Sequence, residues 1–181
     1  ALDKQLQAQH IRILTYVNPF LVDIAASGRP GRNLFAEARE HGYLVTEPNG
    51  QPYMIPNTDF SAGLVDITNA DARKWWKDVI RTEVLGIGAS GWMADFGEAL
   101  PYDARLHSDA APRAFHNQYP EEWARLNREA ITESGRESEL LFFTRSGYRK
   151  SPGQSTLFWL GEQLVTWDVH DGLKSAVVGM L

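Results

Sequence analysis

The chain has 181 residues, of which 43% are hydrophobic and 23% charged, and its formal net charge is −5. These proportions are ordinary for a globular protein with a sizeable core. Basic residues are neither in excess nor clustered, which gives no electrostatic footprint for nucleic acid. No apolar run approaches the ~20 residues of a membrane span, and the absence of cysteine excludes disulfides and thiolate chemistry.

Short β-rich runs alternate with helical segments along the chain. The expected strands cover residues 11–17, 43–45, 52–55, 63–67, 91–95, 140–144 and 156–159, and the expected helices cover residues 2–10, 34–41, 70–85, 121–134 and 171–181. Asn33 is a candidate cap for the second helix, and residues 48–50 (PNG) predict a hairpin turn. Strands that alternate with helices favour an α/β fold with a parallel sheet.

The strand expected at residues 91–95 ends in an acidic residue, Asp95, and a turn follows at once. Pro101, shortly afterwards, cannot continue a strand. A buried strand that delivers a carboxylate at its carboxyl end is how a parallel α/β barrel places a catalytic group. The alternative is that Asp95 caps a helix or stabilises a turn.

The connection after this strand, residues 97–120, is longer than ordinary loops, and loops of this length are often functional. It carries Tyr102, His107, Phe115 and His116. We expect these side chains to form a wall over an active site. Simple packing or hydrogen bonding is the alternative for the two histidines, because metal-ligand spacing is absent. The sequence therefore predicts no metal site.

Residues 92–98 (WMADFGE) resemble the nucleophile motif of glycoside hydrolase family 31, the retaining α-glycosidases. Within that family they resemble the bacterial sulfoquinovosidases, which cleave α-glycosides of 6-deoxy-6-sulfoglucose. The resemblance extends in order and spacing over nearly the whole chain. The further matching blocks are residues 16–19 (YVNP), 65–69 (VDITN), 116–127 (HNQYPEEWARLN), 142–147 (FFTRSG) and 159–163 (WLGEQ).

The resemblance implies an α/β fold, the (β/α)8 TIM barrel that forms the family's catalytic domain. A complete barrel of this kind typically needs ~250 residues. We therefore expect residues 1–181 to form a partial barrel that comprises its central part. Relative to the family, the flanking β domains and the terminal barrel strands are expected to be absent from this chain.

Retaining cleavage needs two carboxyl groups about 5–5.5 Å apart, one as nucleophile and one as acid/base. The resemblance assigns the nucleophile to Asp95 and the acid/base to Glu162. The family usually has Asp at the second position, and Glu reaches roughly 1.5 Å farther. Asp168 is the nearest alternative acid, although it does not fall on the family position and is a candidate helix cap.

The resemblance also assigns residues around the sugar. Arg145 matches an arginine that hydrogen-bonds the sugar at the cleaved bond, and Trp159 matches a tryptophan that lines the same subsite. Glu98 is taken as a support residue that orients the loop. Three more residues, Trp92, Met93 and Trp167, are expected to line the pocket or to pack behind it.

The implied activity is hydrolysis of α-sulfoquinovosides through a covalent glycosyl-enzyme intermediate. The alternatives are another α-glycosidase, such as an α-glucosidase or α-galactosidase, and a non-catalytic or truncated sugar-binding homologue. No metal or organic cofactor is implied, because acid/base glycoside cleavage needs none. We expect a small carbohydrate substrate, no nucleic-acid or membrane partner and a cytoplasmic location, and leave homo-oligomerisation open.

Overall fold

A computed structural model describes residues 2–25, 27–28 and 30–180. Its central element is a four-stranded sheet in the order β1-β5-β6-β7, in which every neighbouring pair is parallel. The strands are β1 (Leu14–Val17), β5 (Gly91–Ala94), β6 (Leu141–Thr144) and β7 (Leu157–Phe158). The predicted parallel α/β sheet is confirmed, with its strands at the positions that the β-rich runs indicate.

A second, antiparallel sheet of three strands lies beside it, in the order β2-β4-β3. Its strands are β2 (Phe20–Leu21), β3 (Met54–Pro56) and β4 (Ser61–Leu64). The strand predicted at residues 63–67 is therefore present in part, as β4, but it belongs to this antiparallel sheet and not to the parallel one. A tight turn, in which Asn57 N donates to Phe60 O at 2.7 Å, joins β3 directly to β4 and makes the pair antiparallel. The hairpin turn predicted at residues 48–50 is confirmed. Glu47 N donates to Gln51 O at 2.8 Å and Gly50 N donates to Glu47 O at 2.9 Å, and an isolated antiparallel bridge joins Thr46 to Pro52.

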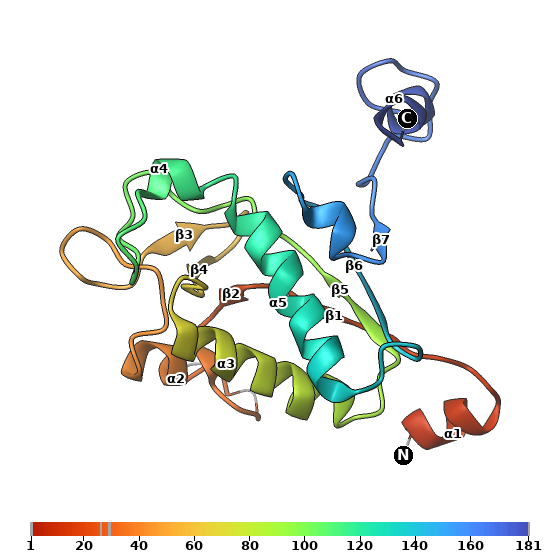
Figure 1. Cartoon of the computed structure of the whole chain (residues 1–181), viewed down its shortest axis with the longest axis horizontal. Coiled ribbons are helices and arrows are strands. Elements are labelled where there is room, and N and C mark those ends of the chain that lie inside the picture. Colours follow the sequence, from red (N-terminus) through yellow and green to blue (C-terminus); the bar gives the residue numbers. More distant parts are fainter. Residues whose placement is uncertain (1, 26, 29, 181) are drawn as a thin grey trace.

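Two long helices cover one face of the parallel sheet (Figure 1). They are α3 (Ala70–Val79) and α5 (Tyr119–Ser134), and the shorter helices are α1 (Leu2–Ala8), α2 (Leu34–Glu40), α4 (Pro112–Phe115) and α6 (Leu173–Met180). The predicted cap is confirmed, because the Asn33 side chain accepts from Ala36 N. None of the helices in the described residues is long and apolar enough to cross a membrane.

The helix expected over residues 70–85 changes its winding at Ile80. A π-helical segment, η1 (Ile80–Leu85), follows α3, and Gly86 N donates to Arg81 O at 3.0 Å. The hydroxyl of Thr82 donates to the carbonyl of Asp78 at 2.9 Å, a side-chain bond that competes with the regular backbone ladder. Periodicity alone does not reveal this widening.

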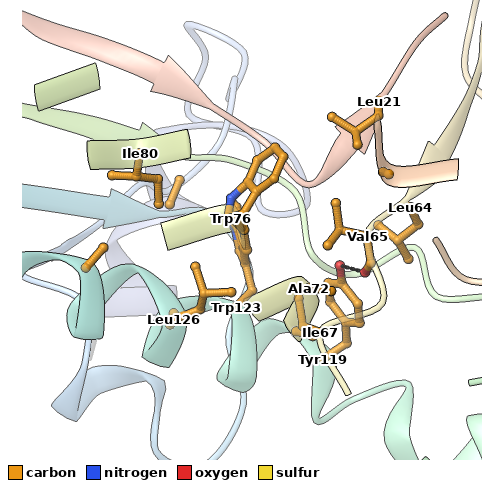
Figure 2. Close-up of a cluster of buried hydrophobic side chains, with 14 of the residues drawn as sticks. Leu21, Leu64, Val65, Ile67, Ala72, Trp76, Ile80, Tyr119, Trp123 and Leu126 are labelled. Atoms are coloured by element: carbon orange, nitrogen blue, oxygen red, sulfur yellow. Dashed lines mark hydrogen bonds between the residues drawn. The ribbon is translucent and has the colours of Figure 1, made fainter. Parts of the chain in front are cut away.

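The core lies between the parallel sheet and the two long helices, and continues toward the antiparallel sheet (Figure 2). Trp76 of α3 and Trp123 of α5 meet there with ring centroids 6.0 Å apart. Successive strand residues point to opposite faces of a sheet. Because Trp92 of β5 is fully buried on the helix side, Met93 is directed to the opposite face.

The strand that leads to Asp95 starts at a position with no room for a side chain. A Cβ on Gly91 would lie 2.1 Å from Leu141 O and 2.9 Å from Leu14 Cδ2. Gly91→Ala is expected to force β5 away from β6 and to destabilise the fold by about 3 kcal/mol, the upper range for overpacking. Urea unfolding measures this, with Gly153→Ala as control because a Cβ there meets nothing within 4 Å. Equal midpoints for the two variants would contradict the close approach.

Candidate active site

Asp95 stands at the carboxyl end of β5 and is 5% exposed. Its backbone N–H donates to Val17 O of β1 at 2.8 Å, which continues the β1–β5 pairing past the strand end. Carboxylate Oδ2 accepts from the Tyr16 hydroxyl at 2.5 Å. Oδ1 is buried and has no hydrogen-bond donor among the described residues, and Arg145 Nε lies 3.3 Å from it.

The chain turns sharply after Asp95. Phe96 has φ +58° and Gly97 has φ +109°, and a non-glycine residue in the left-handed region is uncommon. The Ser146 hydroxyl donates to Phe96 O at 2.5 Å and holds the turn against the end of β6. A Cβ on Gly97 would lie 3.0 Å from Ser146 Oγ and 3.3 Å from Trp123 Cδ1. The turn therefore directs the Asp95 carboxylate by close packing as well as by hydrogen bonds.

Arg145, the first residue after β6, joins two carboxylates. Its Nε and Nη2 donate to Glu98 Oε1 at 3.0 Å and 2.5 Å, and the same Nε lies 3.3 Å from Asp95 Oδ1. The guanidinium also lies over the Phe96 ring, with Cζ 3.7 Å from the centroid. The edge of that ring meets Phe20 at a centroid distance of 5.1 Å. The positive charge of Arg145 is thus held beside Asp95 from several directions.

A cavity of about 520 Å³ opens beside this group. It is lined by four of the predicted site residues: Glu98, Arg145, Trp159 and Glu162. His116 and Asn117 of the long loop also line it, which places His116 where the sequence predicts a wall. Glu162 is exposed and lies on the segment after β7. Asp95 is not a lining residue of the cavity, and Arg145 connects the two.

Another cavity, of about 500 Å³, lies between α3 and α5 on the outside of the molecule, and its lining includes Tyr43, Lys74 and Glu133. None of its lining residues in the described structure follows the carboxyl end of a parallel strand. In α/β barrels the catalytic groups come from those strand ends. We therefore take the cavity beside Arg145 as the candidate site.

Trp92 and Met93 have different surroundings. The Trp92 indole donates to Asn127 Oδ1 on α5 at 2.7 Å and stacks on Phe142 with centroids 6.2 Å apart. It packs behind the strand, the second of the two placements expected for it, because residue 92 has the parity of the helix-facing side. Met93 is half-buried on the opposite face, in register with Tyr16 of β1.

The structure does not bring Trp167 to the candidate site. It is 78% exposed and lines a separate cavity of about 340 Å³ with Leu173 and Ala176. The Asp168 carboxylate accepts from the backbone N–H groups of His170 and Asp171. These two bonds lower the pKa of Asp168, whereas a general acid must keep its proton at working pH. In this structure Asp168 caps the turn before α6, and these bonds favour its ionised form over the protonated form that a general acid needs.

The long loop is fixed by Asp66, a buried acid whose role sequence reasoning did not identify. Asp66 Oδ1 accepts from the Thr68 hydroxyl at 2.6 Å, and Oδ2 accepts from His107 N at 2.6 Å. Farther along, His116 Nδ1 lies 2.6 Å from Leu100 O and its ring is 4.4 Å from that of Tyr102. The His107 side chain is exposed. The signal for Asp66 was its place near the end of the strand predicted at residues 63–67.

Tyr16 is the second residue that sequence reasoning did not assign. It appeared only within the matching block at residues 16–19, and its contact with Asp95 joins positions 79 apart in the chain. Among the described residues, no group of three or more His, Cys, Asp or Glu side chains lies close enough to hold a metal ion. The groups gathered at the site are thus carboxylates, an arginine, aromatic rings and a phenol.

The whole chain, residues 1–181, matches the family model described as the glycosyl hydrolases family 31 TIM-barrel domain. The chain is 39% identical to a sulfoquinovosidase of Escherichia coli (strain K12) and 37% identical to one of Agrobacterium fabrum. Each alignment covers 98% of this chain but 25% and 26% of those proteins. The chain thus spans about a quarter of the length of these relatives.

Solved structures give the same result. A family 31 sulfoquinovosidase from E. rectale, in complex with the aza-sugar inhibitor IFGSQ, superposes with a TM-score of 0.92 at 41% identity. The match covers 99% of this chain and 26% of that one. The resemblance seen in residues 92–98 and the predicted TIM-barrel fold class are both confirmed, and the chain belongs to glycoside hydrolase family 31, of whose TIM-barrel domain it forms a part.

Proposed function

We propose that the protein is a retaining α-glycoside hydrolase in which Asp95 is the nucleophile and Glu162 the general acid/base. The observation that carries the proposal is the placement of Asp95. It is a buried carboxylate at the end of a parallel strand, with Tyr16 donating to one oxygen and Arg145 beside the other. The first step requires an ionised carboxylate, and the positive charge of Arg145 beside Oδ1 is complementary to one.

In the first step a carboxylate oxygen of Asp95 forms a bond to the anomeric carbon while the glycosidic C–O bond breaks. The bonding pair leaves with the departing oxygen, which takes the proton of Glu162. In the second step a water molecule gives a proton to Glu162 and attacks the same carbon, and the bond to Asp95 breaks. Two inversions leave the α configuration unchanged.

The proposed acid lines the same cavity as Arg145 and Glu98. Glu162 is exposed on the segment that follows β7, and the chain then leads away from the body of the molecule to α6 (Figure 1). A Glu is one methylene longer than the Asp usual at this position, and an error of ~1 Å in placing a catalytic group costs ~100-fold in rate. Full activity therefore requires the backbone at residue 162 to lie farther from the sugar than the backbone of the family's Asp, so that the longer side chain brings its carboxyl to the same place.

We propose α-sulfoquinovosides as the substrates. This is supported by the similarity to the two curated sulfoquinovosidases and to the E. rectale enzyme, at 37% to 41% identity. An α-xylosidase of Lactiplantibacillus pentosus is 31% identical over 79% of the chain, so other α-glycosides are the second candidates. A sugar-binding protein without activity is the third, and the altered acid at Glu162 is the observation that favours it.

Hydrolysis of a chromogenic α-sulfoquinovoside, beside the matching α-glucoside and α-xyloside, tests the proposed function. The protein is produced from its complete gene. We expect kcat/KM for the sulfosugar to exceed that for the other two by at least about 100-fold, the discrimination expected where a charged group is specifically bound. A preference for either neutral glycoside would contradict the substrate assignment. Binding of the sulfosugar without turnover would favour the non-catalytic alternative.

A further inference from the structure

The two oxygens of Asp95 have different environments. Oδ1 is buried and faces the Nε of Arg145 at 3.3 Å, without the alignment of a hydrogen bond. Oδ2 accepts from Tyr16 at 2.5 Å, which is the short hydrogen bond typical of a hydroxyl and a carboxylate. Tyr16 is therefore the group that fixes the rotation of the carboxylate about its Cβ–Cγ bond.

The phenol of Tyr16 is itself oriented by the next turn of the chain. Asn18 Nδ2 donates to the Tyr16 hydroxyl oxygen at 3.3 Å. Asn18 Oδ1 accepts from Phe20 N at 2.9 Å, so the amide cannot rotate without losing a bond. The donors therefore run in one direction, from the backbone of Phe20 to Asn18, then to Tyr16 and to Asp95. With its oxygen occupied by the Asn18 donor, the phenol directs its proton at Asp95.

Tyr16 lies on the face of the parallel sheet opposite the helices, in register with Met93 of β5. Its side chain is 53% exposed. Partial burial and the hydrogen bond to Asp95 raise its pKa to about 12. The phenol therefore keeps its proton throughout the pH range in which a glycosidase works, and remains a donor.

We propose that Tyr16 is a positioning residue for the nucleophile, and that the directed contacts from Asn18 through Tyr16 hold the Asp95 carboxylate in the orientation needed for attack on the anomeric carbon. This inference rests on the proposed role of Asp95. A carboxylate oxygen offers more than one lone-pair site, so Oδ2 accepts the phenol proton and still has a lone pair for carbon. The phenol makes no bond to the sugar in this account and transfers no proton.

Tyr16→Phe tests the proposal, because it removes the hydroxyl and keeps the ring. The probe is a 5-fluoro glycosyl fluoride of the better substrate, which accumulates as the covalent intermediate. We expect the rate constant for labelling to fall by roughly 10- to 100-fold, the range for a small misplacement of a reacting group, with the binding constant of the probe little changed.

The matched control is Tyr53→Phe. Tyr53 also donates to an aspartate, Asp103, at 3.0 Å, but it lies outside the candidate site. Its loss is expected to leave the labelling rate constant and the binding constant of the probe at wild-type values. Unfolding midpoints of both variants show whether either loses structure.

An independent variant leaves the phenol in place. Asn18→Asp keeps the acceptor for Phe20 N and replaces the donor to Tyr16 with an acceptor, which diverts the phenol proton from Asp95. We expect slower labelling, in the same direction as Tyr16→Phe. Wild-type labelling rates in both variants would overturn the proposal for Tyr16 while leaving Asp95 as nucleophile. Failure of the wild-type protein to be labelled at Asp95 would instead overturn the proposed function, and the inference with it.

Discussion

Asp95→Ala is expected to lower turnover by about 10⁴-fold or more, the loss typical when a catalytic nucleophile is removed. Asp95 is buried at the end of β5, and replacing its carboxylate with the methyl group of alanine leaves a small space beside Tyr16 and Arg145. Added azide should enter that space and restore turnover. Because the azide replaces the carboxylate in a single displacement, the product should be a glycosyl azide of inverted, β configuration, which nuclear magnetic resonance identifies.

The matched control for this variant is Asp103→Ala. Asp103 also accepts a tyrosine hydroxyl, that of Tyr53, but it lies away from the cavity beside Arg145. Its removal should leave turnover within about twofold, as for an ordinary surface substitution. Turnover by Asp95→Ala at the level of this control would show that another group attacks the sugar.

Glu162→Gln is expected to give the second-largest loss of turnover, and the size of this loss should depend on the leaving group of the substrate. Loss of a general acid costs typically 10²- to 10⁴-fold, and the cost should be greatest for an alkyl glycoside, whose departing oxygen needs the proton. A nitrophenolate leaving group departs without that proton. With such a substrate the covalent intermediate should accumulate, and nitrophenolate should be released in an initial burst. Stopped-flow absorbance measures the burst and the slow phase that follows.

Asp168→Asn is the comparison that decides between the two candidate acids. The Asp168 carboxylate is occupied by the N–H groups of His170 and Asp171, so we expect a wild-type dependence on the leaving group. A leaving-group dependence that appears in Asp168→Asn and not in Glu162→Gln would contradict the assignment. Glu162→Asp should show in addition whether the longer side chain is adapted to its segment. A gain in rate would mean that the site is built for the shorter acid.

Local sequence patterns predicted the helices and strands whose type and ends depend only on residues close by in the sequence. The apolar run ending at Asp95 became β5, and Asn33 caps α2 as predicted. Gly135 directly follows the helix predicted at residues 121–134, and it adopts the left-handed conformation that ends α5. The antiparallel sheet could not be predicted in the same way, because β2 has only two residues and pairs with a strand more than forty positions away.

The composition of the site was predictable only in part. Arg145, Trp159 and Glu162 line one cavity, as their positions at successive strand ends suggest. For Trp92 the sequence left two placements open, because a tryptophan beside a catalytic motif serves equally well as core, and only the parity of the strand decides between them. Tyr16 was not assigned because its partner is supplied by tertiary structure, through the parallel pairing of β1 with β5. The separation of Trp167 from the cavity depends on the path of the segment after β7, which no periodic pattern determines.

Asp95 is proposed to form a covalent bond to the sugar, and that bond can be trapped. The wild-type protein is incubated with the 5-fluoro glycosyl fluoride, digested, and mapped by mass spectrometry. We expect one label per chain, on the peptide that contains Asp95 and on that side chain. A label on Glu98 or Glu162 instead, or hydrolysis of the natural glycoside with inversion at the anomeric carbon, would contradict it.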